Sequence, residues 1–251
     1  MSKQPPVQQP PPVQRLRLRY AKRGRGRFAS HRDVARVFER ALRRAEVPMA
    51  YSSGFNPHPR ISWANPAPTG AESEAEYVDL GLATVMDLAA VGQALEAAFP
   101  LGLAVVGVAS AEPGGLMSRL LASAWSIELR PASATSTAPP ASDTAWRQQL
   151  AAAVAAFTAA DTVIVERETK RGPRQFDARS AVTQIELEQT ERSVVSVVIE
   201  HTSPLVRPDD VVRAFQQLDP ELNFGAVLSR RLAQGSLRAG QVVDPVQPSL
   251  G

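Results

Sequence analysis

Apolar and polar residues alternate in the first segment that has the composition of a folded element. In residues 13–20, VQRLRLRY, apolar side chains largely take turns with arginines. A period of two is that of a half-buried strand, so we predict a strand whose outer face is basic. Residues 1–12, MSKQPPVQQPPP, contain many prolines and little to bury, and we expect a disordered tail there.

The period changes to that of a helix over residues 30–45. Ser30 and Asp33 have the spacing of a capping box, and Pro48 follows the last apolar position. The apolar residues at helical spacing, which we expect to be buried, are Val34, Val37, Phe38, Ala41, Leu42 and Ala45. The opposite face of the same helix carries Arg32, Arg36, Arg40 and Arg43.

The following segments complete a β-α-β-β-α-β order. We predict a strand at residues 49–53 or 60–64, a strand at 76–82, a helix at 85–98 and a strand at 103–110. This is the order of a ferredoxin-like unit, in which two helices pack on one face of a four-stranded antiparallel sheet.

The C-terminal half nearly repeats this order of elements. Strands are predicted at residues 124–130, 162–168, 183–189, 193–200 and 224–233, and helices at 143–160 and 208–218. The predicted fold class is therefore α+β, with two tandem ferredoxin-like units and antiparallel sheets. The expected units are residues 13–121 and 122–235, with a flexible loop at 131–142, an inserted loop at 170–180 and a flexible tail at 236–251.

Charge is distributed unevenly along the chain. Residues 1–60 contain fourteen Lys and Arg against three Asp and Glu, a net charge of +11, whereas residues 61–251 have a net charge of −8. A concentrated positive field favours polyanions such as RNA or DNA, or an acidic protein surface. The alternative is a basic face that only contacts solvent.

Absent residue types narrow the possible chemistry. The chain has no cysteine, which excludes a disulfide, a thiol nucleophile and an iron–sulfur cluster or zinc held by its own thiolates. No apolar run reaches the roughly 18 residues of a membrane helix, and no apolar stretch follows the first lysine. We therefore expect a cytoplasmic protein without a membrane segment. Nucleotide-binding loops, a nucleophile elbow and a zinc-protease motif are also missing from the sequence.

Two histidines are candidates for chemistry. His31 opens a basic helix, where the dipole disfavours its protonation, so it is either a base for an RNA 2′-hydroxyl or a residue that caps, packs or contacts a phosphate. His58 lies in NPHP, whose prolines stiffen the backbone on both sides. The nearby Phe55 and Trp63 either stack on bases or complete the core of a proline-rich edge strand.

Two charged segments have a binding and a structural interpretation each. Glu72, Glu74 and Glu76 alternate along a predicted strand, where they either bind a cation or pair with the arginines of the first helix. The stretch KRGPRQFDARS, residues 170–180, is either a phosphate or partner contact or a solvent-exposed hairpin.

The candidate nucleic-acid contacts are the basic residues of these segments together with two side chains of the proline-rich stretch. They are Arg15, Arg17, Arg19, Lys22, Arg23, Arg25, Arg27, Arg32, Arg36, Arg40, Arg43, Phe55, His58, Arg60, Lys170, Arg171, Arg174 and Arg179.

The stretch FASHRDVARVFERALRRAEVPMAYSSGFNPHPRISWANPAPTGAESEAEYVD resembles the N-terminal signature of the radical-SAM-linked protein family, and KRGPRQFDAR is similar to its second motif. The sequence departs from the family pattern at Trp63 and at NPAP. The positions that match the first motif are Ser30, His31, Asp33, Arg40, Arg43, Gly54, Phe55, Pro57, His58, Pro59, Ser62, Gly70, Ser73, Glu76 and Asp79. Those that match the second are Lys170, Arg171, Asp177 and Arg179.

The resemblance implies a partner. Members of that family are encoded beside a radical-SAM protein or fused to it, and often lie near a ribonuclease of the E/G type. We expect no cofactor on this chain itself; an iron–sulfur cluster and S-adenosylmethionine are expected only in the partner.

Three functions follow as hypotheses. The first is a non-catalytic RNA-binding accessory protein that presents an RNA to a radical-SAM enzyme for modification or processing. The second is a metal-independent endoribonuclease or RNA-modifying enzyme that uses His31 or His58. The third is a protein-binding scaffold for the radical-SAM partner.

Overall fold

The computed structural model of the 251-residue chain describes residues 8–111, 115–132, 143–170, 172–188, 190 and 192–246. The chain divides into two compact units, one of residues 1–120 with 244–251 and one of residues 121–243. The described residues form four α-helices and antiparallel strand pairs, which confirms the predicted α+β class. None of the described helices has the length and apolar character needed to cross a membrane.

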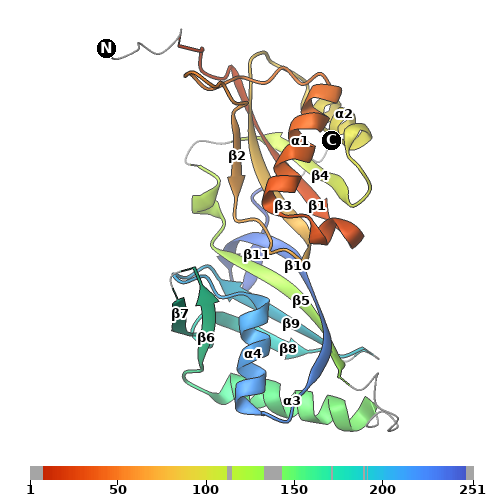
Figure 1. The fold of residues 1–251 in the computed structure, drawn as a ribbon, viewed down its shortest axis with the longest axis vertical. Helices are drawn as coiled ribbons and strands as arrows, with labels where there is room; N and C mark the ends of the chain where they lie inside the picture. Colours follow the sequence, from red (N-terminus) through yellow and green to blue (C-terminus); the bar gives the residue numbers. More distant parts are fainter. Residues whose placement is uncertain are drawn as a thin grey trace. The chain divides into compact units, whose positions relative to one another are not determined.

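The first unit is a sheet with two helices on one face (Figure 1). Its strands lie in the order β4-β1-β3-β2, and every neighbouring pair is antiparallel. The strands are β1 (Gln14–Lys22), β2 (Ile61–Ala64), β3 (Glu72–Leu82) and β4 (Leu103–Ser110). The helices are α1 (His31–Arg44) and α2 (Leu88–Ala98), with short 3₁₀ turns at Gly24–Phe28 and Met117–Arg119.

Helix α1 has the predicted cap and the predicted buried stripe. The Ser30 hydroxyl accepts the Asp33 N–H, and the Asp33 carboxylate accepts the Ser30 N–H, so both halves of the capping box are present. Phe38 is fully buried in the stripe, and its ring lies 4.7 Å from Tyr20 and 4.9 Å from Trp63. Burying one such aromatic side chain contributes about 1.5–3 kcal/mol, so this cluster fixes α1 on the sheet.

The other face of this sheet is covered, not open. Leu116, Leu120 and Val246 pack there against β3 residues such as Tyr77, and all are buried. We predicted a basic outer face for the first strand. That prediction is wrong in part, because residues 116–120 and 244–246 cover this face. The chain after residue 235, expected to be a flexible tail, is ordered as strand and buried contact as far as Val246.

The second unit has the strand order β10-β5-β9-β8, again antiparallel throughout, and β11 extends the edge of β10. Helices α3 and α4 pack against each other through Phe157 and Phe215, whose rings lie 5.6 Å apart. The strands are β5 (Ala122–Pro131), β8 (Val182–Leu187), β9 (Val194–Glu200), β10 (Phe224–Arg238) and β11 (Gln241–Val243). The helices are α3 (Asp143–Ala159) and α4 (Pro208–Leu218).

One predicted strand and one predicted loop of this unit form a separate hairpin. Strand β6 (Ile164–Thr169) pairs with β7 (Gly172–Asp177), so the segment interpreted as an inserted loop is a strand. Val165 and Phe176 face each other across the pair and are buried, which gives the hairpin its own apolar side. Most of the expected flexible loop at 131–142 lies outside the described residues.

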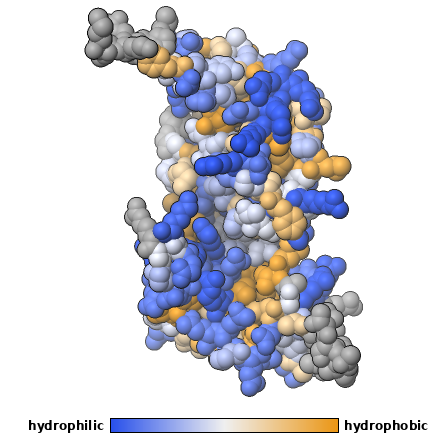
Figure 2. Space-filling model, viewed as in Figure 1, coloured by the Kyte–Doolittle hydropathy of each residue, from blue (hydrophilic) through white to orange (hydrophobic). Residues whose placement is uncertain are grey.

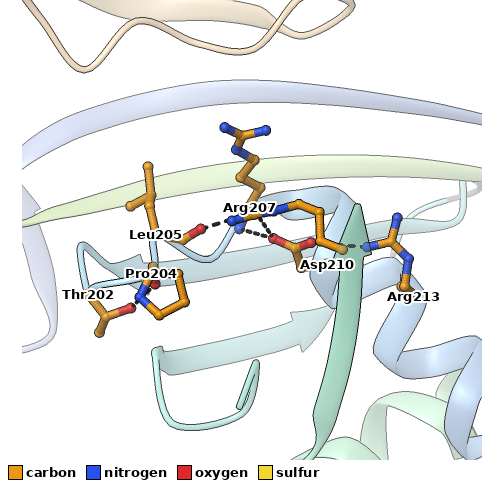
Figure 3. Close-up of polar contacts among 7 residues, drawn as sticks. Thr202, Pro204, Leu205, Arg207, Asp210 and Arg213 are labelled. Carbon is orange, nitrogen blue, oxygen red and sulfur yellow. Dashed lines mark hydrogen bonds and ion pairs between the residues drawn. The ribbon is translucent and has the colours of Figure 1, made fainter. Parts of the chain in front are cut away.

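A buried carboxylate joins the hairpin to α4. Asp210 is 1% exposed and accepts from the Arg207 N–H at 2.9 Å, from Arg213 at 3.2 Å and from Arg167 of β6 at 2.7 Å. Figure 3 shows the backbone N–H of Arg207 and the guanidinium of Arg213 directed at this carboxylate at the start of α4, while the Arg207 side chain points away from it. Burial raises the pKa of Asp210, and the nearby arginines oppose that shift.

Candidate nucleic-acid interface

Several basic side chains of the first strand are bound inside the first unit. Arg17 is 2% exposed and forms two hydrogen bonds, of 2.8 and 3.0 Å, with the carboxylate of Asp79, its cross-strand neighbour. Arg19 pairs with Asp244, and Lys22, also buried, donates to the carbonyl oxygens of residues 67 and 68. Arg17, Arg19 and Lys22 are therefore structural here and not free to contact a phosphate on the surface.

The acidic strand supplies further internal partners. Glu74 forms an ion pair with Arg23, which lies before α1, so the expected pairing with arginines of that helix is not what the described residues show. This pair raises the pKa of Arg23. Glu72 accepts the Gly24 N–H at 2.8 Å, and the buried Glu76 accepts the Ala67 N–H. The glutamates thus stabilise the loops around β3, and the described residues contain no group of three or more His, Asp or Glu that could hold a metal ion.

Helix α1 presents the arginines that remain exposed. Among the described residues no ion pair involves any of its four outer arginines, and Figure 2 shows hydrophilic side chains gathered over this helix in the upper right of the view. Their spacing spans eleven residues, about 17 Å along the axis. The four are Arg32, Arg36, Arg40 and Arg43, and all are exposed.

Other predicted basic contacts of this unit differ in exposure. Arg15 and Arg25 are exposed, whereas Arg27 is half-buried, with its guanidinium 4.6 Å above the Phe28 ring. Arg60 is half-buried, and its Nε donates to the Tyr51 carbonyl oxygen at 3.1 Å.

The proline-rich stretch forms a closed turn, which we call the NPHP turn, residues 51–60. The backbone of Ser52 donates to the His58 carbonyl oxygen at 2.8 Å, and the His58 N–H donates to the Ser52 hydroxyl at 3.0 Å. Gly54, at a φ of 131°, provides the left-handed bend that other residues rarely adopt. Pro57 and Pro59 flank His58, so the imidazole is held on a stiff, exposed support.

Phe55 and Trp63, the two candidates for base stacking, have different roles. Phe55 is 64% exposed, as a side chain for surface recognition would be. Trp63 lies in β2 and packs edge-to-face against Tyr20, Phe38 and His31, at 6.3, 4.9 and 5.2 Å between ring centroids. Trp63 therefore completes the core, and only Phe55 of this pair is available to a ligand.

The histidines do not lie together. His31 is the first residue of α1, whereas His58 lines a hollow with Glu39 and Arg43 from the C-terminal half of that helix. Twelve helical residues separate His31 from Arg43, or about 18 Å. A catalytic pair of His31 and His58 is not assembled within this unit.

Two hollows flank His58. The first, which we call the Tyr51 hollow, has a volume of about 260 Å³ and is lined by Glu39, Arg43, Tyr51 and His58 over Leu42 and Met49. The second, the Arg60 hollow, has a volume of about 280 Å³ and is lined by Arg15, Ser52, His58, Arg60, Ser62 and Asp79.

Sequence reasoning missed two side chains of the first hollow. Glu39 lies within the predicted helix at residues 30–45 and Tyr51 within the predicted strand at 49–53, and neither was a candidate site residue. The i, i+4 spacing of Glu39 and Arg43 could have indicated a shared position on α1. Nothing local in the sequence shows that the turn folds back onto them.

The second motif is divided between structure and surface. The Asp177 carboxylate accepts the N–H groups of Val163 and Arg179; burial acts to raise its pKa, but these and the Ser180 hydrogen bonds outweigh burial and lower it. Arg179 donates to the Val182 carbonyl oxygen at 2.7 Å and lies over Phe157, so it is structural. Lys170 and Arg174 are exposed, and Arg171 lies outside the described residues.

A known family model matches most of the chain. The model of a family described as "uncharacterized protein conserved in bacteria (DUF2344)" matches residues 15–208, which include both motifs and the NPHP turn. No curated protein sequence matches the chain.

Proposed function

The chain belongs to this family of uncharacterized bacterial proteins, DUF2344, and from that premise we propose that it is an RNA-binding accessory protein whose contact surface is the outer face of α1. The observation that carries the proposal is the row of four exposed arginines without an ion pair among the described residues. A row of about 17 Å suits several successive phosphates better than one small anion.

Internal pairing of the other basic residues sharpens the proposal. Arg17, Arg19 and Arg23 each have a carboxylate partner, so part of the positive charge of residues 1–60 is neutralised on β1 and just after it. The outer face of α1 keeps four exposed arginines outside any ion pair among the described residues. Arginine forks match phosphate geometry, and the exposed Phe55 adds a ring on which a base can stack.

We further propose the finer fold and partner that the sequence suggested. The strand orders β4-β1-β3-β2 and β10-β5-β9-β8 support two ferredoxin-like units, the second with the β6-β7 hairpin inserted between its first helix and its second sheet strand. The proposed partner is a radical-SAM protein, which would carry the iron–sulfur cluster and bind S-adenosylmethionine. Its proposed role is to modify or process the RNA that this chain presents.

Filter binding to total tRNA and rRNA across a salt series tests the RNA proposal. Each neutralised phosphate contributes about 0.7 (single strand) to 0.9 (duplex) to the slope of log affinity against log salt. An Arg36/Arg40/Arg43 triple alanine variant should therefore bind more weakly and lose a slope of about 2 to 3. The matched control is Arg130/Arg192/Arg238 to alanine, which removes three exposed arginine charges from the second unit.

Equal affinity and slope for the wild type and the α1 triple variant would refute the proposal. Weak RNA binding together with nuclease-resistant co-purification of an acidic protein would favour the scaffold function instead. RNA cleavage by His31 has less support, because its ring packs on Trp63. His58 remains the candidate base, on the exposed NPHP turn. Identical product patterns from wild type and a His31/His58 double alanine variant, with labelled RNA in EDTA, would remove that hypothesis.

A further inference from the structure

The two hollows beside His58 differ in chemistry. The Tyr51 hollow has an apolar floor, one aromatic ring, one carboxylate and one guanidinium. The Arg60 hollow is lined by two arginines and the hydroxyls of Ser52 and Ser62, and its one carboxylate, Asp79, is already paired with Arg17. Pro59 and His58 belong to both, so the hollows are adjacent across the NPHP turn.

The volumes of the two hollows suit a small ligand that has two parts, one for each hollow. Pockets for drug-sized molecules have about 300–1,000 Å³. At about 260 and 280 Å³ each hollow falls below that range, as expected for a fragment such as a base or a phosphate. A flat apolar group fits the first hollow and an anion fits the second.

The polar groups of the Tyr51 hollow indicate which base it would bind. Tyr51 is 42% exposed, so its ring can stack on a base. Among the described residues neither Glu39 nor Arg43 forms an ion pair, although they are one turn apart on α1, and the Glu39 carboxylate is thus a bidentate acceptor without a cation bound to it. Guanine is the one common base whose Watson–Crick edge offers two adjacent N–H donors, at N1 and N2, to such a carboxylate.

We propose that the NPHP turn binds an unpaired guanine nucleotide, with its base in the Tyr51 hollow and its 5′-phosphate in the Arg60 hollow. The inference deepens the proposed RNA-binding function, because it names the nucleotide that would be selected while the α1 arginines outside the hollow, Arg32, Arg36 and Arg40, bind the rest of the strand. Hydrogen bonds between Ser52 and His58 hold the turn closed before a ligand arrives. Little ordering is then needed on binding, which favours affinity.

Amide NMR titration of the full chain with GMP, AMP, CMP, UMP and guanosine tests the site. GMP should shift the resonances of residues 39, 43, 51 and 58, at concentrations about tenfold lower than the other nucleotides, since the lost hydrogen bonds are made to a charged group. Glu39→Gln, which keeps the shape of the side chain, should reduce the preference for GMP to within about twofold.

The phosphate is tested separately at the second hollow. In the wild type GMP should bind more tightly than guanosine. Arg15→Ala should reduce that difference, with Arg60 still present, and leave the preference for guanine unchanged. Tyr51→Ala should weaken every nucleotide, and circular dichroism checks that each variant is folded.

The outcomes separate this inference from the function on which it rests. If GMP moves no resonance of the NPHP turn, or if Glu39→Gln keeps the full preference, the nucleotide site is wrong even when RNA binds through α1. If GMP binds the turn but an Arg32/Arg36/Arg40 triple alanine variant, which leaves the lining of the Tyr51 hollow intact, binds RNA as the wild type does, the site is supported and the α1 surface is refuted.

Discussion

Replacing Arg17 by alanine distinguishes a structural arginine from one that contacts RNA. The side chain is 2% exposed, and its two hydrogen bonds to Asp79 join β1 to β3 at directly opposed positions. Arg17→Ala leaves the Asp79 carboxylate, itself only 18% exposed, without its cation. Breaking a buried pair in this way costs about 3–5 kcal/mol, mostly as the penalty of an uncompensated charge.

The expected effect on unfolding follows from this free energy. With a urea dependence of about 2 kcal/mol/M, a loss of 4 kcal/mol lowers the midpoint of unfolding by about 2 M. Arg15→Ala is the matched control, because Arg15 lies on the same strand but is exposed, and it should change stability by less than about 0.5 kcal/mol. Replacing both partners, Arg17→Met with Asp79→Leu, should restore most of the loss.

Fluorine NMR of protein labelled with 5-fluorotryptophan is the assay. Trp63 is the one tryptophan of the first unit, while Trp125 and Trp146 belong to the second, so one signal follows the unit that contains Arg17. The signal is assigned with Trp63→Phe. An unchanged midpoint for Trp63 in Arg17→Ala, together with a loss of RNA binding as large as that of the α1 triple variant, would refute the structural role.

Three further changes test other parts of the structure. A Cβ on Gly26 would come within 2.6 Å of a backbone oxygen, so Gly26→Ala should lower the free energy of unfolding in urea by about 1–3 kcal/mol. Gly107→Ala is the control and should be tolerated, because its Cβ meets only a side chain at 3.5 Å. Equal effects of the two changes would contradict the close packing at Gly26. Because the pKa of Asp177 is lowered, its carboxylate stabilises the fold above about pH 4, and that contribution is lost as the pH falls through the pKa of the folded state. The difference in unfolding free energy between wild type and Asp177→Asn should therefore shrink towards about pH 3. A difference that stays constant with pH would refute this role of the carboxylate. Ser30→Ala removes the cap of α1 and should lower the free energy of unfolding by about 1 kcal/mol. NMR titration of this variant should show the pKa of Asp33 rising towards its ordinary value, because the Ser30 hydroxyl is the main cause of its depression.

The elements of the first unit could be predicted from the sequence because their signals are local. The capping box of Ser30 and Asp33 and the apolar spacing around Phe38 place α1 to within one residue of its observed start. The face of β1 that carries Arg17 was also predictable from alternation. What covers that face was not, because Val246 lies more than two hundred residues away along the chain.

The β6-β7 hairpin shows a different limit. Gly172 and Pro173 are typical of a turn, and the basic residues around them favour exposure, so residues 170–180 were interpreted as a loop. The strand forms because Phe176 is buried opposite Val165, and because Arg167 reaches the buried carboxylate of Asp210 on α4. Neither partner is marked in the sequence of the loop itself.

The structure also decides which positive charges are accessible to a ligand. A count of charges along residues 1–60 gives the sign of the field, but it does not distinguish an arginine paired with a carboxylate from one in solvent. Arg17 is closed off because Asp79 faces it across the sheet, whereas Arg36 and Arg40 remain open because the face of α1 that carries them has solvent beside it. In the proposed site, specific recognition depends less on the number of arginines than on a carboxylate that has no ion pair beside them. Glu39, which lines the Tyr51 hollow without an ion pair among the described residues, is that carboxylate.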